Sequence, residues 1–119
     1  MASKRARPED YLQRCVVAKL RKLRRLHGGR IRFQTCQPEG HRSLWQQQHD
    51  KAMGRLERGA PELLIYDGRT LPGIMWIIEL KAEKGRVSEA QAEWAAWLTD
   101  REYRYAVVRS VEELVALLG

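Results

Sequence analysis

Several kinds of residue and pattern are scarce in this sequence of 119 residues. It has two cysteines, Cys15 and Cys36, which make neither a disulfide framework nor the CxxC spacing of a metal site. No apolar run approaches the roughly 20 residues that a membrane-spanning helix needs. The basic start MASKRARPED leads into no apolar stretch of a signal peptide. These absences exclude a disulfide-stapled scaffold, and they favour a reducing, cytoplasmic setting with no membrane partner.

The length predicts a single domain, residues 8–119, which follows a basic tail, residues 1–7. Charge is unevenly distributed along the sequence. Residues 1–60 carry 15 Lys and Arg against 5 Asp and Glu, whereas residues 61–119 carry 7 against 10. Such a basic half favours a polyanionic partner, most simply nucleic acid. A solvated basic helix that aids solubility is the alternative explanation.

The alternation of apolar and polar residues predicts a mixed α/β domain. A helix should open at Pro8 and end at Gly28, with a buried stripe made of Leu12, Val16, Leu20 and Leu23. Strands are expected at residues 30–36, 62–66, 73–82 and 103–109. Helices are expected from Ser43, at residues 88–102, where Ala90, Trp94, Trp97 and Leu98 should be buried, and at residues 110–119. The expected fold is one mixed sheet of about four strands flanked by helices on both faces, the strand at 73–82 being covered on each side.

Charged residues interrupt the apolar strand IIELK, where Glu79 and Lys81 share one face. If Tyr66 pairs with Met75 on the preceding strand, Glu62 falls opposite Glu79. Two facing carboxylates repel when buried, and a bound Mg²⁺ or Mn²⁺ removes that repulsion. A neighbouring lysine could hold an attacking water and offset phosphate charge. This pattern fits metal-assisted phosphodiester hydrolysis, whereas an ordinary ion pair at a sheet edge is the alternative.

Two further residues have alternative roles. In SEAQ, Ser88 fits a helix N-cap with Gln91 reaching back to it, and a glutamine in a first helical turn could equally face the site. These alternatives stay open. Glu9 lies along the apolar stripe of the first helix, so it points inward or along the domain edge.

Taken in order, these motifs resemble the VRR-NUC branch of the PD-(D/E)xK nucleases, which have a restriction-endonuclease-like core. The matching segments are QPEGHRS, Pro61-Glu62, Glu79-Leu80-Lys81, VSEAQ and the closing YAVVRSVEELVALL. The resemblance covers most of the chain from Pro8 onward. One departure stands out, because the family usually has Asp after the proline and this sequence has Glu62.

The resemblance implies a structure-selective DNA endonuclease that needs Mg²⁺ or Mn²⁺. It implies catalytic roles for Glu62, Glu79, Lys81 and Gln91, and metal ligands at Glu9, Glu62, Glu79 and Leu80. DNA contacts are expected from His41, Arg42, Ser43, Lys84 and Arg86. It also implies a homodimer that acts on branched DNA, such as a four-way junction, in a bacterial or phage-infected cell.

Two other functions remain as hypotheses. The chain could be a DNA-junction-binding module with a decayed nuclease site, since Glu62 departs from the family pattern. It could also be a structural protein in which E-x-K forms a surface ion pair. Trp94 and Trp97 are expected in the core or at a dimer contact rather than as platforms for stacked bases.

Overall fold

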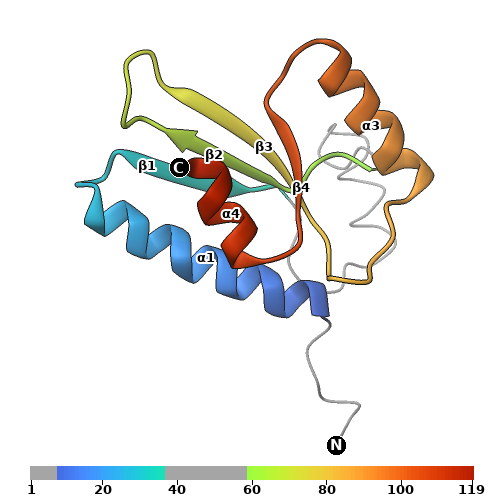
Figure 1. The fold of residues 1–119 in the computed structure, drawn as a ribbon, viewed down its shortest axis with the longest axis horizontal. Coiled ribbons are helices and arrows are strands. Elements are labelled where there is room, and N and C mark those ends of the chain that lie inside the picture. The colour runs from blue at the N-terminus through green and yellow to red at the C-terminus, as the bar shows by residue number, and fades with distance from the viewer. Residues whose placement is uncertain (1–7, 37–58) are drawn as a thin grey trace, which may run out of the picture.

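The computed structural model describes residues 8–36 and 59–119 as one mixed sheet with helices packed around it (Figure 1). The elements in chain order are α1 (Pro8–Leu26), β1 (Ile31–Thr35), β2 (Leu63–Asp67), β3 (Ile74–Leu80), α3 (Glu89–Asp100), β4 (Tyr105–Val108) and α4 (Val111–Leu118). The α/β fold class is confirmed. The tail and the helix expected from Ser43 lie outside the described residues. Within those described, no helix is long and apolar enough to cross a membrane.

The four strands lie in the order β1-β2-β3-β4. The first two pairs are antiparallel, and β4 runs parallel to β3 after the chain has crossed over through α3. Tyr66 pairs with Met75, so the predicted register is confirmed. Paired residues share a face, which places Leu63 with Ile78 on one side of the sheet and Tyr66 with Met75 on the other.

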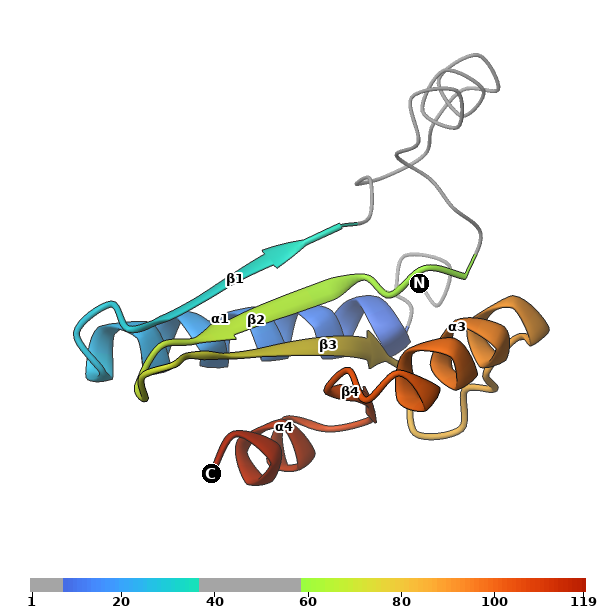
Figure 2. The same cartoon turned by 90° about the horizontal axis from the view of Figure 1, so that it is seen from above.

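One face of the sheet carries the core. The α1 residues Leu12, Val16 and Leu20 are buried there as the periodicity predicted, and Leu23 packs against them partly buried. Leu114 of α4 joins the same cluster, and Figures 1 and 2 show α1 and α4 along the sheet. Burial of each such side chain stabilises the fold by roughly 1.5–3 kcal/mol. This packing fixes the strands that carry the candidate site.

The opposite face is only partly covered, which corrects two predictions. Cover on both sides of the whole strand at 73–82 is wrong, because Met75 near the start of β3 is 39% exposed. Of the predicted buried stripe of α3 only Leu98 is buried, because Ala90 and Trp94 are half-buried and Trp97 is 47% exposed. α3 contacts the sheet mainly at β4, so its outer aromatic residue stays on the surface. There Trp97 stacks on Tyr103, with 6.0 Å between ring centroids.

Candidate active site

Two buried carboxyl groups meet at one end of the central strand pair. Glu79 lies in β3, and Glu62 immediately precedes β2. Because Leu63 pairs with Ile78, the register carries Glu62 to the position across from Glu79. Glu62 is 8% exposed and Glu79 is 2% exposed. The chain therefore removes two acids from water at the same place, on the sheet face opposite to α1 and α4.

A shared proton makes this pairing tolerable. The carboxyl groups of Glu62 and Glu79 hydrogen-bond each other, which requires one of them to be protonated. Burial, followed by the charge of Glu62 and the hydrogen bond with it, raises the pKa of Glu79 from 4.5 to about 8. Burial also raises the pKa of Glu62, although the backbone N–H of Leu80 donates to its Oε1 over 3.2 Å and opposes this. The pair therefore holds a proton more tightly than a carboxyl group in water does.

Lys81 brings a cation to the same place. Its backbone N–H donates to the carbonyl of Val108 over 3.1 Å, so the ladder with β4 continues past the end of β3. Its Nζ lies 3.7 Å from Oε2 of Glu9, which comes from the first turn of α1. The positive charge of Lys81 lowers the pKa of both Glu62 and Glu79, against the effect of their burial. Lys81 thus faces three acids from three parts of the chain.

Gln91 performs both of the roles between which the sequence left a choice. Its side-chain Oε1 accepts from the backbone N–H of Ser88 over 3.0 Å, and its own backbone N–H donates to Ser88 Oγ over 3.2 Å. This capping box begins α3. The Nε2 group of Gln91 donates to Oε2 of Glu79 over 2.9 Å. Because the cap uses the amide oxygen, the amide nitrogen is oriented toward Glu79.

Gly59 allows the chain segment that precedes Glu62 to pack against α3. Gly59 has a φ of 80°, which favours glycine over other residues. A Cβ at this position would lie 2.5 Å from the backbone carbonyl carbon of Ala90, next to Gln91. The close contact therefore brings the segment before Glu62 and the first turn of α3 together.

Arg109 and Tyr105 were not singled out by sequence reasoning. The Nη1 group of Arg109 donates to three backbone carbonyls of the turn directly after Lys81, at 2.8 Å, 3.3 Å and 2.8 Å, those of Ala82, Glu83 and Gly85. Burial and the charge of Glu79 raise the pKa of Tyr105. Nothing in YAVVR marks either residue, because the relevant neighbours lie more than 20 residues away in the sequence.

A hollow of about 820 Å³ lies between the start of α1 and the turn after β3. Its lining includes Glu9, the partner of Lys81, together with Asp10, Glu83 and Lys84. Three acids and one base make this opening more favourable to cations than to phosphate. Lys84 and Arg86 are exposed in this region, as DNA contacts would have to be. His41, Arg42 and Ser43 lie outside the described residues.

The donor set at the acidic pair fits a hard divalent cation. Mg²⁺ commonly takes one or two protein carboxylates and completes its shell with water or substrate phosphate. A cation between Glu62 and Glu79 would replace their shared proton and balance both charges. Among residues 8–36 and 59–119, no group of three or more His, Cys, Asp or Glu side chains could hold a metal ion. Ligand roles for Glu9 and for the Leu80 carbonyl therefore stay predictions.

Comparisons with known proteins bear on the family and the fold of the chain. Residues 4–112 match the family model of the VRR-NUC domain. Among solved structures, the chain is similar to a "VRR_NUC domain protein" with a TM-score of 0.59 and 20% sequence identity. That similarity covers 96% of this chain and 87% of the other, and at this identity it establishes the fold alone. No curated protein matches the chain.

Proposed function

The chain belongs to the VRR-NUC family of nucleases, and we propose that it is a divalent-metal-dependent endonuclease that hydrolyses phosphodiester bonds in branched DNA. The observation that carries the proposal is the meeting of Glu62 and Glu79 across two strands, with Lys81 beside them. Burial of three ionisable side chains in one place is costly without a function that uses them.

Each residue of the site has a definite task in this proposal. Glu62 and Glu79 would hold Mg²⁺ or Mn²⁺, which when bound polarises the scissile phosphate and lowers the pKa of a water. Lys81 offsets the negative charge that builds on the phosphate and positions the attacking water. Glu9 holds the Lys81 ammonium in place, and Gln91 orients the carboxylate of Glu79 through its 2.9 Å hydrogen bond.

The basic face of α1 supports DNA as the substrate. Arg14, Arg21 and Arg25 lie at helical spacing on the exposed side of this helix. They form no ion pair among the described residues, so their charges are available to phosphates. A homodimer would present two such sites with two-fold symmetry, which suits paired cuts in a four-way junction.

The test is cleavage of labelled four-way, flapped and linear DNA, resolved on a denaturing gel with and without Mg²⁺ or Mn²⁺. We expect metal-dependent cuts in the branched substrates. Lys81→Ala should lower the rate by at least about 100-fold, the usual size of losing a charge-stabilising group. Lys19→Ala removes the same charge from α1 and should keep most of the activity.

A DNA-binding module with a decayed site is the competing outcome. It would bind junctions with the same salt dependence in EDTA and in Mg²⁺, and neither the wild-type chain nor Glu62→Asp would cut them. Cleavage restored by Glu62→Asp alone would instead identify the longer side chain as the defect. The convergence of Glu62 with Glu79 favours the active enzyme.

A further inference from the structure

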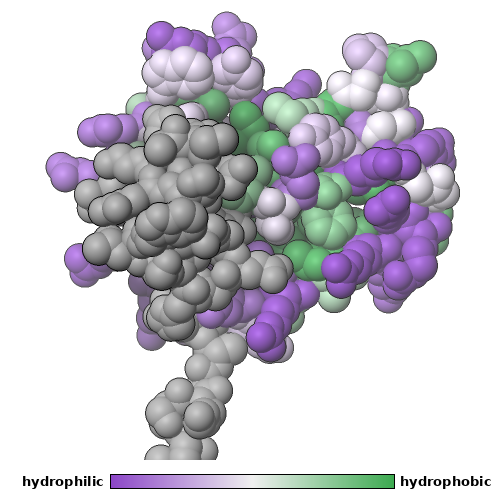
Figure 3. Space-filling model, turned by 180° about the vertical axis from the view of Figure 1, so that it is seen from behind, coloured by the Kyte–Doolittle hydropathy of each residue, from purple (hydrophilic) through white to green (hydrophobic). Residues whose placement is uncertain are grey.

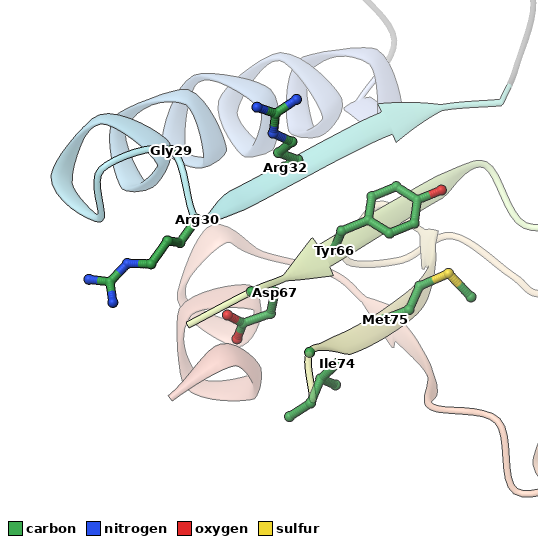
Figure 4. A pocket seen from close by; sticks show the side chains of 9 residues that line it. Gly29, Arg30, Arg32, Tyr66, Asp67, Ile74 and Met75 are labelled. Carbon is green, nitrogen blue, oxygen red and sulfur yellow. The ribbon is translucent and has the colours of Figure 1, made fainter. Parts of the chain in front are cut away.

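A row of three exposed side chains crosses the sheet at the end far from the acidic pair. Arg32 of β1 pairs with Tyr66 of β2, and Tyr66 pairs with Met75 of β3. Paired residues share a face, so Arg32, Tyr66 and Met75 project from neighbouring positions on the same side of the sheet. Tyr66 and Met75 are each 39% exposed, and Arg32 is exposed as well. Figure 4 shows them on three neighbouring strands.

This row lines a shallow pocket of about 370 Å³, the size of a small ligand site. Its other lining residues include Arg30, Asp67 and three glycines, which bring bare backbone to the rim. Seen from behind, the molecule shows apolar surface bordered by hydrophilic side chains (Figure 3). The pocket thus combines an aromatic floor with a basic edge. We call Arg30, Arg32, Tyr66 and Met75 the sheet platform.

The net charge of the platform is positive. The one acid that lines the pocket, Asp67, forms an ion pair with Arg69 at 2.8 Å, and that partner lowers the pKa of Asp67. Arg30 and Arg32 form no ion pair with any described residue. Both guanidinium groups keep their positive charge beside an exposed aromatic ring, although Nε of Arg30 donates to the carbonyl of His27 over 3.0 Å, and they favour an anionic partner with flat, apolar parts. Single-stranded nucleic acid has that chemistry.

The platform and the acidic pair lie on the same sheet face. Tyr66 is four residues from Glu62 along β2, and Met75 is four residues from Glu79 along β3. At about 3.3 Å per residue, the two places are roughly 13 Å apart. Stacked nucleotides repeat every 3.4 Å or so along one strand, and the gap is therefore about four nucleotides. One DNA strand could contact both places.

We propose that the sheet platform binds an unpaired strand of the DNA whose phosphodiester bond is cut at Glu62 and Glu79, an inference that rests on the proposed nuclease function. The ring of Tyr66 offers a stacking surface for an unpaired base, whereas the bases within a duplex are already stacked on both sides. Arg30 and Arg32 bind the phosphates of that strand. A second copy of this chain fits less well, because a two-fold contact centred here would bring these arginines against each other.

The experiment compares the affinity of Lys81→Ala protein, which should bind without cutting, for three labelled DNAs in EDTA. These are a blunt duplex, the same duplex with a single-stranded tail of about four nucleotides, and the tail sequence alone. Fluorescence anisotropy should show roughly tenfold tighter binding to the tailed duplex than to the blunt one, the expected gain from a stacked base.

Tyr66→Ala should remove most of this preference and leave blunt-duplex binding unchanged, whereas Tyr66→Phe should retain it. Arg32→Ala should weaken binding of the tail. It should also reduce the slope of log K against log salt concentration by about one. Tyr103→Ala is the matched control, an exposed tyrosine on the surface beside α3, and should retain the preference. Because Tyr66 is exposed, its variants should unfold at the wild-type temperature.

Equal affinity for blunt and tailed DNA would overturn the inference, as would loss of both affinities on Tyr66→Ala. If Tyr66→Ala instead halves the molar mass in light scattering, the platform is a contact between copies and the inference is wrong. Cleavage by the wild-type chain is scored separately. Tail preference without any cleavage would support the platform and count against the nuclease function. Cleavage without tail preference would support the nuclease function and count against the platform.

Discussion

Raising the pH in the absence of a divalent metal should destabilise this protein, and Glu79 is the main cause. Its pKa in the folded state, about 8, exceeds the ordinary value of 4.5, so the folded state binds this proton more tightly than the unfolded chain does. The stabilisation that results is complete below about pH 4.5 and is lost as the pH rises through about 8. The raised pKa of Glu62 acts in the same direction.

The size of the effect follows from the shift. One pKa unit corresponds to about 1.4 kcal/mol, and a rise from 4.5 to about 8 sets an upper limit of roughly 5 kcal/mol for Glu79. Once both carboxylates are charged they separate and admit water, which relieves part of the repulsion. We expect a net loss of roughly 2 kcal/mol, or about 10 °C in Tm for a domain of this size.

The assay is urea unfolding followed by circular dichroism in EDTA, at constant ionic strength, between about pH 5.5 and pH 8.5. Glu79→Gln keeps the shape but cannot ionise, and its stability should stay nearly flat over this range. Glu93→Gln removes an exposed acid from α3 and should follow the wild type. Mg²⁺ at about ten times its Kd should restore about 1.4 kcal/mol at the upper pH. A flat wild-type profile, or an equally steep fall in Glu79→Gln, would refute the reasoning.

Three further predictions concern the residues around the acidic pair. Arg109→Ala removes the hydrogen bonds that hold the turn after Lys81. It should lower the rate of single-turnover cleavage about tenfold, while the Kd for DNA stays within about twofold. Arg109→Lys should recover part of the rate. Gly59→Ala combines an unfavourable φ with a close approach to backbone, and urea unfolding should show a loss of about 1–3 kcal/mol. Gln91→Ala should cost about 1 kcal/mol through the lost cap, and should also weaken the Mg²⁺-dependent rise in Tm because Glu79 loses a partner.

The arrangement of strands could be predicted from the sequence because it depends on period and pairing. Alternation in IIELK put Glu79 and Lys81 on one face, and a turn-rich loop of known length joined the two strands. Pairing Tyr66 with Met75 then placed Glu62 across from Glu79, and a slip of one residue would have reversed that face. Because the backbone of a strand is regular, one correct pair of residues fixes the pairing along the whole strand.

Contacts that depend on the angle between elements could not be predicted in this way. Helical spacing marks Trp97 as part of an apolar stripe, but how much of α3 the sheet covers is set by where the helix lies. In the sequence Arg109 is an ordinary basic residue after a strand, and nothing near it indicates that its guanidinium contacts a turn more than 20 residues earlier in the chain. Gln91 shows a third limit, since one amide has a donor and an acceptor and the two proposed roles were never exclusive.

The glutamate at position 62 is best understood from what its carboxyl group reaches. Glu62 stands just outside β2, and its Oε1 nevertheless accepts from the backbone of Leu80 in the neighbouring strand. It also hydrogen-bonds the carboxyl group of Glu79. An aspartate on the same backbone would withdraw the carboxyl group by about 1.5 Å, one carbon–carbon bond, and would lose these contacts unless the strand ends moved closer. The longer side chain is therefore what allows Glu62 to make both contacts. With the backbone in the same position, Glu62→Asp should lower rather than raise the cleavage activity.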